Sequence, residues 1–426
     1  MTNSRFPLVA LRRFVKINPN VVLPTNGEVE YLPMEKVRSG FFEHFVADIA
    51  TLPSNLNAFA EGDILMAKVT PCFENGNLCL ASNIRNQVGC CSTELFVLRP
   101  NTTLVLPEYL LFLLQADEFK QTATKYMRGT GGLKRIPTDW LLNYEFPLPS
   151  IEVQAVIVRF LQHVECQVRS ISNAYNQKIA KLSEYRQSLI IKVVTKGLDP
   201  NVEMKDSGIE WIGQIPKNWN IARVGVLYRL SNGLSKDGES FGHGLPFMTY
   251  GDAYKSPYTP KKLSGLVETT PSERATYSVK RGDVFFTRTS ETVEEIGLSS
   301  TCLKDIPDGT FAGFLIRARP QTALITPEFA GFYFRSQCHR PFFIKEMNLV
   351  TRASLTQGLL SKLPVLIPPL EEQNHIYQYL FKSCQKLDSI SANLRKALKE
   401  LDEYRSSLIS IAVTGRLNIE GHTHVE

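Results

Sequence analysis

An internal repeat constrains the fold of this chain more than any other feature. Residues 149–195 align without a gap with residues 368–414, at a constant offset of 219, and 17 of the 47 positions are identical. Before each copy lies a more divergent region that still shares landmarks, such as Gly62-Asp63 with Gly282-Asp283 and Arg99-Pro100 with Arg319-Pro320. The chain is therefore expected to contain one variable region and one similar segment, each present twice.

The similar segments carry a heptad pattern. In the second copy apolar residues recur in alternating steps of four and three, while the first copy has lysines at two of these positions, Lys178 and Lys192. Such a pattern, sustained for about five heptads, predicts a coiled-coil seam. Its main members are Ile157, Leu161, Val164, Val168, Ile171, Leu182 and Leu189 in the first copy, and Ile376, Leu380, Leu387, Ile390, Leu394, Leu401 and Leu408 in the second.

The predicted helices cover roughly 36 residues each, which corresponds to about 54 Å at 1.5 Å per residue. Alone, each helix would leave a long apolar seam in water, so we expect the two copies to pair with each other as an antiparallel coiled coil with an approximate two-fold axis. The alternative is two ordinary helices, each buried in its own domain. The length of the seam disfavours this alternative, because helices in globular proteins average about 11 residues.

The variable regions have the pattern of α+β domains. Short apolar or alternating runs bounded by Gly, Pro and Asn predict strands, and longer periodic runs predict helices at Pro107–Lys125 and Pro327–Met347. The expected order is a first domain at 1–146, a first helix at 147–198, a connector at 199–219, a second domain at 220–366, a second helix at 367–417 and a tail at 418–426. Each domain has about 150 residues, which is enough for a core of its own.

Composition excludes several classes of protein. With 43% hydrophobic and 21% charged residues the chain is globular, and no apolar run approaches the roughly 20 residues of a membrane span. The eight cysteines contain no Cys-x-x-Cys pair, so a zinc ribbon is not expected and reduced core thiols are. We expect a cytoplasmic protein without a metal site, whose net charge of +6 suits a polyanionic partner without establishing one.

Motifs for catalysis are missing from the sequence. The chain has no Asn/Asp-Pro-Pro-Tyr/Phe tetrad of amino-methyltransferases, no Gly-x-x-x-x-Gly-Lys-Ser/Thr loop, no Gly-x-Ser-x-Gly elbow and no His-Glu-x-x-His helix. Basic and hydroxyl side chains do cluster in loops near the landmarks, where they could contact duplex phosphates and base edges. These candidates for DNA binding are Lys68, Thr70, Arg128, Lys134 and Arg135 in the first domain, and Arg288, Thr289, Thr351 and Arg352 in the second.

Taken together, these motifs resemble those of the specificity subunit of type I restriction–modification systems, over essentially the full chain. The similarity includes the connector 204–219, the two helix starts with Pro-x-x-Glu-x-Gln at Pro149 and Pro368, and the two Gly-Asp strands. It also includes the segments Glu184-Tyr185-Arg186 and Glu403-Tyr404-Arg405. One departure is the opening Phe6-Pro7-Leu8, which lacks the tryptophan that precedes the second domain at Trp219.

This resemblance implies a non-catalytic subunit with two target-recognition domains, each of which reads one half of an asymmetric bipartite sequence in double-stranded DNA. It also implies that the helix pair sets the spacing between the half-sites and binds two methyltransferase subunits, and that motor-nuclease subunits join for restriction. S-adenosylmethionine, ATP and Mg would then belong to these partner subunits, and none to this chain.

Two other functions stay open from the residues alone. One is a nuclease or methyltransferase with an unrecognised site, and the other is a coiled-coil scaffold that does not bind DNA. The sequence leaves the target bases, the spacer length and the modified base undetermined, because base readout depends on loop geometry and on the deformability of DNA.

Overall fold

The computed structural model describes residues 4–130, 132–290, 296–346 and 353–417. The chain forms two compact units: unit 1 contains residues 1–176 and 394–426, and unit 2 contains residues 177–393. The helices α4 (Ile151–Lys196) and α11 (Leu370–Val413) are each continuous and contribute to both units. Both are longer than the heptad pattern alone required, with 46 and 44 residues.

The globular part of unit 1 is built around two four-stranded sheets, with strand orders β2-β9-β6-β7 and β4-β3-β8-β5. A short ladder joins β1 to β10. The strands are β1 (Leu8–Ala10), β2 (Val15–Ile17), β3 (Glu28–Leu32), β4 (Val46–Asp48), β5 (Asn57–Ala60), β6 (Ile64–Ala67), β7 (Leu78–Leu80), β8 (Val88–Cys91), β9 (Leu95–Pro100) and β10 (Glu145–Pro147); the helices are α1 (Pro107–Gln115), α2 (Asp117–Tyr126) and α3 (Thr138–Asn143).

The globular part of unit 2 repeats the first of these sheets. Its strand order β14-β21-β17-β19 corresponds to β2-β9-β6-β7, and the ladder β13-β23 corresponds to β1-β10. The strands are β11 (Met204–Asp206), β12 (Gln214–Pro216), β13 (Asn220–Arg223), β14 (Tyr228–Asn232), β15 (Phe241–Met248), β16 (Gly265–Val267), β17 (Val284–Thr287), β18 (Thr289–Ser290), β19 (Ser299–Thr301), β20 (Thr310–Phe311), β21 (Leu315–Pro320), β22 (Ala353–Ser354) and β23 (Pro364–Ile367); the helices are α5 (Val224–Leu227), α6 (Tyr250–Lys255), α7 (Pro271–Thr276), α8 (Pro327–Arg335), α9 (Arg340–Glu346) and α10 (Gln357–Lys362). The second sheet differs, because β16-β15-β20 has three strands.

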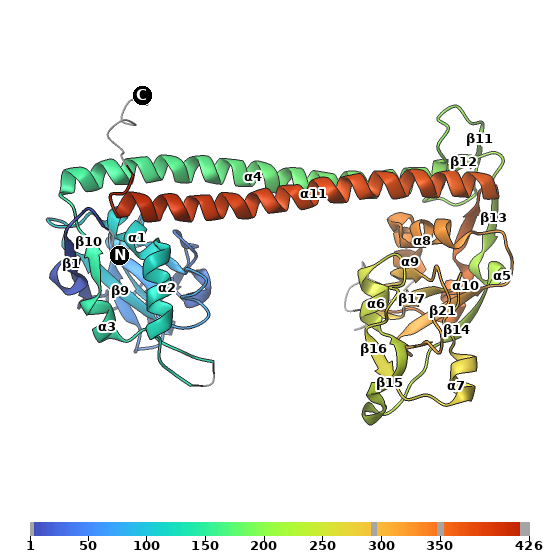
Figure 1. Cartoon of the computed structure of the whole chain (residues 1–426), viewed down its shortest axis with the longest axis horizontal. Coiled ribbons are helices and arrows are strands. Elements are labelled where there is room, and N and C mark those ends of the chain that lie inside the picture. The colour runs from blue at the N-terminus through green and yellow to red at the C-terminus, as the bar shows by residue number, and fades with distance from the viewer. Residues whose placement is uncertain (1–3, 131, 291–295, 347–352, 418–426) are drawn as a thin grey trace. The chain divides into compact units, whose positions relative to one another are not determined.

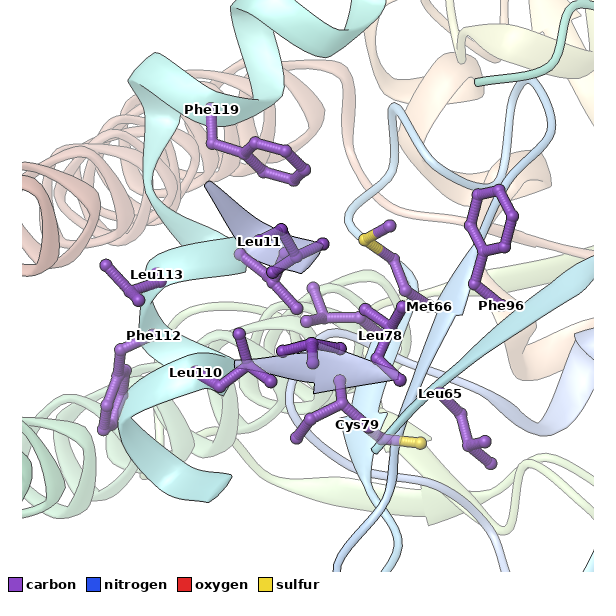
Figure 2. Packing of buried hydrophobic residues seen from close by; sticks show 14 of the residues in the cluster. Leu11, Leu65, Met66, Leu78, Cys79, Phe96, Leu110, Phe112, Leu113 and Phe119 are labelled. Atoms are coloured by element: carbon purple, nitrogen blue, oxygen red, sulfur yellow. The ribbon is translucent and has the colours of Figure 1, made fainter. Parts of the chain in front are cut away.

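The core of unit 1 lies between the sheet β2-β9-β6-β7 and the helices α1 and α2. Figure 2 shows side chains of the strands, among them Met66 and Leu78, and of the helices, among them Leu110 and Phe119, in one hydrophobic cluster. All four residues of β6 are buried, as expected for a central strand that is covered on both faces. The same cluster includes residues of α4 and α11, so the globular part is packed directly against the helix pair.

The two long helices are antiparallel, as the sequence predicted. In unit 1 the start of α4 packs with the end of α11, where Ile157 and Leu161 share a core with Ile409 and Val413. In unit 2 the end of α4 packs with the start of α11, where Val194 shares a core with residues such as Ile376 and Leu380. Figure 1 shows α4 beside α11 in each unit. The α+β fold with a paired internal repeat is confirmed, and the alternative of two separate helices is wrong.

The seam itself differs from the prediction in its central part. Ile171 and Ile390 are 40% and 39% exposed, so they do not belong to the buried seam. The contact instead passes through the partly buried residues one position later, Ser172 and Ser391. The same shift is seen at position 178, where the lysine is exposed and the neighbouring Ile179 is half-buried. A shift of this kind arises because a straight helix has about 3.6 residues per turn, so its buried stripe drifts away from a strict repeat of 3.5 residues.

The predicted helices of the globular parts are each interrupted. The pattern at Pro107–Lys125 forms α1 and α2, because Ala116 between them has extended backbone angles and is buried. The pattern beginning at Pro327 likewise breaks at Ser336, whose hydroxyl donates to the carbonyl of Tyr333 at 2.7 Å and helps to end α8. Met347 lies outside the described residues.

Candidate nucleic-acid interface

All five candidate residues of unit 1 meet where β6 ends. β6 leads directly into Lys68, and residues 128–130 and 132–136 lie against it, where Arg135 pairs with both Val69 and Arg128 as in a hairpin. The Thr70 hydroxyl donates to the carbonyl of Gly132 at 2.7 Å and accepts the Lys134 amide at 2.9 Å. Two segments that are 60 residues apart in sequence therefore form one basic surface, a proximity that the sequence did not predict.

The cations of this surface are not equivalent. Arg135 forms an ion pair with Glu94 at 2.9 Å, and the hydrogen bond from this guanidinium lowers the pKa of the Glu94 carboxyl. Lys68 places its ammonium 5.7 Å from the centre of the Phe96 ring, at the distance of a cation–π contact. Arg128 and Lys134 are exposed. A phosphate would therefore compete with Glu94 for Arg135.

Unit 2 presents its candidates at the corresponding strand end. Arg288 follows β17, and Thr289 lies in β18, which pairs with β22 so that Thr289 is opposite Ser354. The Leu355 amide donates to the carbonyl of Arg288 at 2.7 Å, which fixes the loop after β17 against the segment after β22. Thr351 and Arg352 lie outside the described residues, so their place on this surface stays a prediction.

A buried ion pair holds the strand that carries each basic loop. The Asp63 carboxylate accepts two hydrogen bonds from Arg99, both at 2.7 Å, and Asp283 accepts two from Arg319 at 2.7 and 2.6 Å. Both carboxylates are essentially inaccessible to solvent. Bidentate pairs of this kind fix geometry as well as contributing energy. These residues are landmarks of the repeat in the sequence, but their pairing was not predicted, although each Asp precedes its Arg by 36 positions.

A buried glutamine docks each long helix onto its globular part. Gln154 accepts the amide of Leu106 at 2.9 Å and donates to the carbonyls of Leu104 and Pro149. Gln373 makes the corresponding three hydrogen bonds, to Thr326, Leu324 and Pro368. This explains the glutamine of the Pro-x-x-Glu-x-Gln motif, because its side chain satisfies backbone groups of the loop before α1 or α8.

Phe6 takes in unit 1 the place of Trp219 in unit 2. The Trp219 ring is fully buried beside Gly197 at the end of α4, and its indole donates to Glu372 at 3.0 Å. The Phe6 ring lies against Gly415 at the end of α11, so closely that a Cβ on this glycine would be 2.7 Å away. Both glycines have positive φ and end their helices. The first domain thus lacks a tryptophan at its start because the smaller Phe6 ring occupies the equivalent packing position.

The helix pair also exposes apolar side chains. In unit 1 Ile171 and Tyr404 are 40% and 59% exposed, and in unit 2 Ile390 and Tyr185 are 39% and 58% exposed. The offset of 219 relates Ile171 to Ile390 and Tyr185 to Tyr404, so each unit exposes one isoleucine and one tyrosine, from different helices. We call these four residues the helix patches.

Six cysteine side chains of the described residues are buried. Burial raises the pKa of Cys79 to about 12 and that of Cys90 to about 11. Within the described ranges no group of His, Cys, Asp and Glu residues has the arrangement of a metal site. In the same part of the chain no helix combines the length and apolar character needed to cross a membrane.

The fold and its repeated basic loops correspond to a known family. A sequence profile described as the type I restriction modification DNA specificity domain matches residues 23–181 and 228–400. The chain belongs to this family of type I restriction–modification specificity proteins. The match includes the first 33 of the 47 residues of each copy of the repeat.

Individual relatives agree with this assignment. The EcoAI specificity subunit of Escherichia coli is 32% identical over 157 residues, which cover 36% of this chain and 27% of that protein. The chain therefore matches about a quarter of the length of that relative. The EcoKI specificity subunit of Escherichia coli K12 is 24% identical over 411 residues, which cover 92% of this chain and 83% of that protein.

A solved structure shows the same fold over nearly the whole chain. Its subject is the complex assembly and conformational transition of the type I R-M system. The matched chain has a TM-score of 0.73 at 19% identity, with 97% of this chain and 98% of that chain covered.

Proposed function

We propose that this chain is the DNA-reading subunit of a type I restriction–modification complex, and that the globular part of each unit reads one half of an asymmetric bipartite target. The observation that carries this proposal is the repeated strand end. The same locked strand presents a cation in both units, at Lys68 and Arg288, whereas the loops around these cations differ in sequence and in pairing. A shared scaffold with unlike loops suits two different half-sites.

In this proposal phosphate contacts position each unit and other loop residues select the bases. Lys68 and Arg288 would contact the backbone, since a cation at a strand end is a sequence-independent anchor. Thr70 already bonds to the hairpin backbone, so its role is to hold the hairpin in place. Thr289, Thr351, Arg352, Arg128 and Lys134 are then the candidates for selective contacts. The chain performs no chemistry itself, and S-adenosylmethionine, ATP and Mg are bound by partner subunits.

The helix pair would set the distance between the half-sites. Its two helices of 46 and 44 residues span about 69 and 66 Å at 1.5 Å per residue. One turn of duplex DNA measures about 34–36 Å, so the pair is long enough for two modules to meet the same face of DNA with unread base pairs between them.

Deletion of one heptad from each helix tests whether the helix pair sets the distance between the half-sites. Removing residues 172–178 from α4 and 391–397 from α11 keeps the seam in register and shortens both helices by about 10 Å. The expected result is unchanged half-sites with a shorter spacer, measured by selection from randomised duplexes with the methyltransferase partner present. If the variant kept the original spacing between the half-sites, the helix pair would not set this distance. A control that deletes seven residues from one helix only should disrupt the pairing and lose binding.

We further propose that the two helix patches each bind one methyltransferase subunit. Apolar side chains exposed on a polar helix surface are typical of interaction sites. Tyr185→Ser and Tyr404→Ser should each reduce the number of bound methyltransferase subunits from two to one, and the double variant should bind none, as measured by mass photometry. Complexes of wild-type stoichiometry in the double variant would contradict this role. The exposed Tyr126→Ser in the globular part is a control expected to have no effect.

Two other functions give different outcomes. A purified chain that cleaves or methylates DNA without partners would indicate a catalytic subunit. Binding that depends on neither DNA sequence nor salt would indicate a scaffold unrelated to DNA. Salt-dependent binding that discriminates between sequences supports the proposed function.

A further inference from the structure

The two units differ at one corresponding place in the contact between helix pair and globular part. In unit 1 the Arg405 guanidinium donates to the Glu165 carboxylate at 2.7 Å and to the Gln115 side chain at 3.4 Å. The charge of Arg405 is therefore neutralised within the unit, and only 16% of its side chain is exposed.

The repeat replaces both of these partners in unit 2. Arg186 corresponds to Arg405, but Cys384 stands where unit 1 has Glu165, and Arg335 stands where it has Gln115. A carboxylate and a neutral amide are thus exchanged for a thiol and a second guanidinium. Burial raises the pKa of the Cys384 thiol, so it stays neutral and supplies no negative charge.

Arg186 is left with little compensation. Its Nε is buried and makes no hydrogen bond, although this atom lies 3.5 Å from Oδ1 of Asp388, and Arg186 also makes a hydrogen bond with the Cys384 thiol. Its neighbouring carboxylate, Asp388, lies at 3.5 Å and is 65% exposed, so this ion pair is weak. A buried guanidinium N–H without an acceptor costs free energy that a bound anion would recover.

A cavity opens beside Arg186. It has a volume of about 320 Å³, and its walls include Lys255, Arg335 and Arg340 as well as Arg186, with no carboxylate among the lining residues. Arg335 donates to the carbonyls of Ala253 and Ser299, both at 3.0 Å, which fixes its position without neutralising it. Burial, reinforced by the charge of Arg186, lowers the pKa of Arg335. Four cations therefore surround a volume that could hold a small anion.

We propose that this cavity in unit 2 binds a phosphate group. Four basic groups match the charge of a phosphate, whereas in unit 1 the Arg405 guanidinium already donates to one carboxylate and one glutamine. The phosphate has two possible sources, free inorganic phosphate or the backbone of DNA. DNA is the second source because the cavity lies next to the basic loop of unit 2. Leu298 lines the cavity, and its carbonyl accepts the amide of Thr287, one residue before Arg288, at 2.9 Å.

Titration of the full chain with inorganic phosphate, at constant ionic strength with chloride, tests the proposal without DNA. Calorimetry should show binding, and phosphate should raise the melting temperature of unit 2. Arg186→Gln should weaken phosphate binding at least about tenfold, because two charge-assisted hydrogen bonds are lost. Cys384→Glu should place a carboxylate where unit 1 has Glu165, so this variant should melt higher without phosphate and should no longer respond to it.

Matched controls come from unit 1. Glu165→Cys removes the carboxylate there but leaves Gln115 neutral, so phosphate binding should keep its wild-type affinity and its stoichiometry of one. Three results would overturn the proposal: no preference of the wild-type chain for phosphate over chloride, an unchanged phosphate affinity in Cys384→Glu, or equal stabilisation by acetate.

DNA binding by Arg186→Gln then identifies the source of the phosphate. A uniform loss of affinity for duplexes, with a salt slope lower by about one, indicates the DNA backbone. Unchanged DNA binding indicates free phosphate. Both results are compatible with the site, and the phosphate titration stands even if the proposed reading of a bipartite target fails.

Discussion

The two units share their internal supports and differ on their surfaces. Asp63 with Arg99 and Asp283 with Arg319 make the same buried ion pair, and Gln154 and Gln373 make the same three hydrogen bonds. The basic loops do not match: unit 1 uses the hairpin pairing of Arg128 with Arg135, whereas unit 2 uses the short ladder of β18 and β22. Buried polar networks tolerate few changes, because a lost partner leaves an unsatisfied group, while surface loops can change freely.

The largest expected effect comes from breaking one of the shared ion pairs. Asp63→Ala should destabilise unit 1 by about 2–3 kcal/mol, since it removes two charge-assisted hydrogen bonds while Arg99, which is 32% exposed, keeps part of its hydration. Asp283→Ala should do the same to unit 2. Differential scanning calorimetry should show one transition lowered and the other retained in each variant. Equal shifts of both transitions would mean that the units do not melt separately.

A smaller effect concerns the pH dependence of the free energy of unfolding, which should differ between the two units. His339 in unit 2 corresponds to Phe119 in unit 1, and both are buried. Burial, reinforced by the charge of Arg340, lowers the pKa of His339 from 6.5 to about 4. The unfolded chain therefore takes up a proton more readily than the folded chain, so stability falls as the pH decreases from about 6.5 towards 4.

Between pH 7 and pH 5 this loss should reach about 2 kcal/mol in unit 2. His339→Phe, which introduces the residue of unit 1, should remove most of the pH dependence of the unit 2 transition and leave that of unit 1 unchanged. Urea unfolding at both pH values measures the difference. A variant as sensitive to pH as the wild type would show that other groups are responsible.

The smallest effects concern the basic loops. Lys68→Ala and Arg288→Ala should each weaken DNA binding by about 1–2 kcal/mol and reduce the salt slope by about one, whatever the DNA sequence. Arg135→Ala should cost less, because Glu94 already pairs with this guanidinium. Glu94→Gln is the control and should strengthen binding by releasing Arg135. Fluorescence anisotropy at several salt concentrations measures all four variants. If the Lys68 or the Arg288 variant bound DNA at low salt as tightly as the wild type, the substituted residue would not belong to the interface.

Much of the fold follows from sequence periodicity. The heptad pattern and the constant offset of 219 predicted two long antiparallel helices, because a seam of that length requires an apolar partner. The seam was misplaced at Ile171 and Ile390, since helical periodicity does not distinguish between adjacent candidate positions. The breaks at Ala116 and Ser336 were also missed, because both residues are compatible with a helix and tertiary packing decides their conformation.

The candidate site was predicted less completely. Basic loops could be recognised from composition, and Lys68 and Arg288 from their shared place after a repeated strand. The meeting of Thr70 with Lys134 could not, because it depends on a long-range hairpin without a sequence pattern. The neutralisation of Arg135 by Glu94, and the replacement of the Glu165 carboxylate by the Cys384 thiol near Arg186, likewise depend on contacts between segments that are far apart in the chain.

Mapping of methylated bases tests the central proposal most directly. A host genome would be sequenced with the chain and its methyltransferase partner expressed together, and again after the globular part of unit 2 is exchanged for that of another family member. The account predicts one asymmetric motif of two half-sites with a fixed unread spacer, and an exchange that replaces one half-site only. A continuous motif, or an exchange that alters both half-sites, would contradict it.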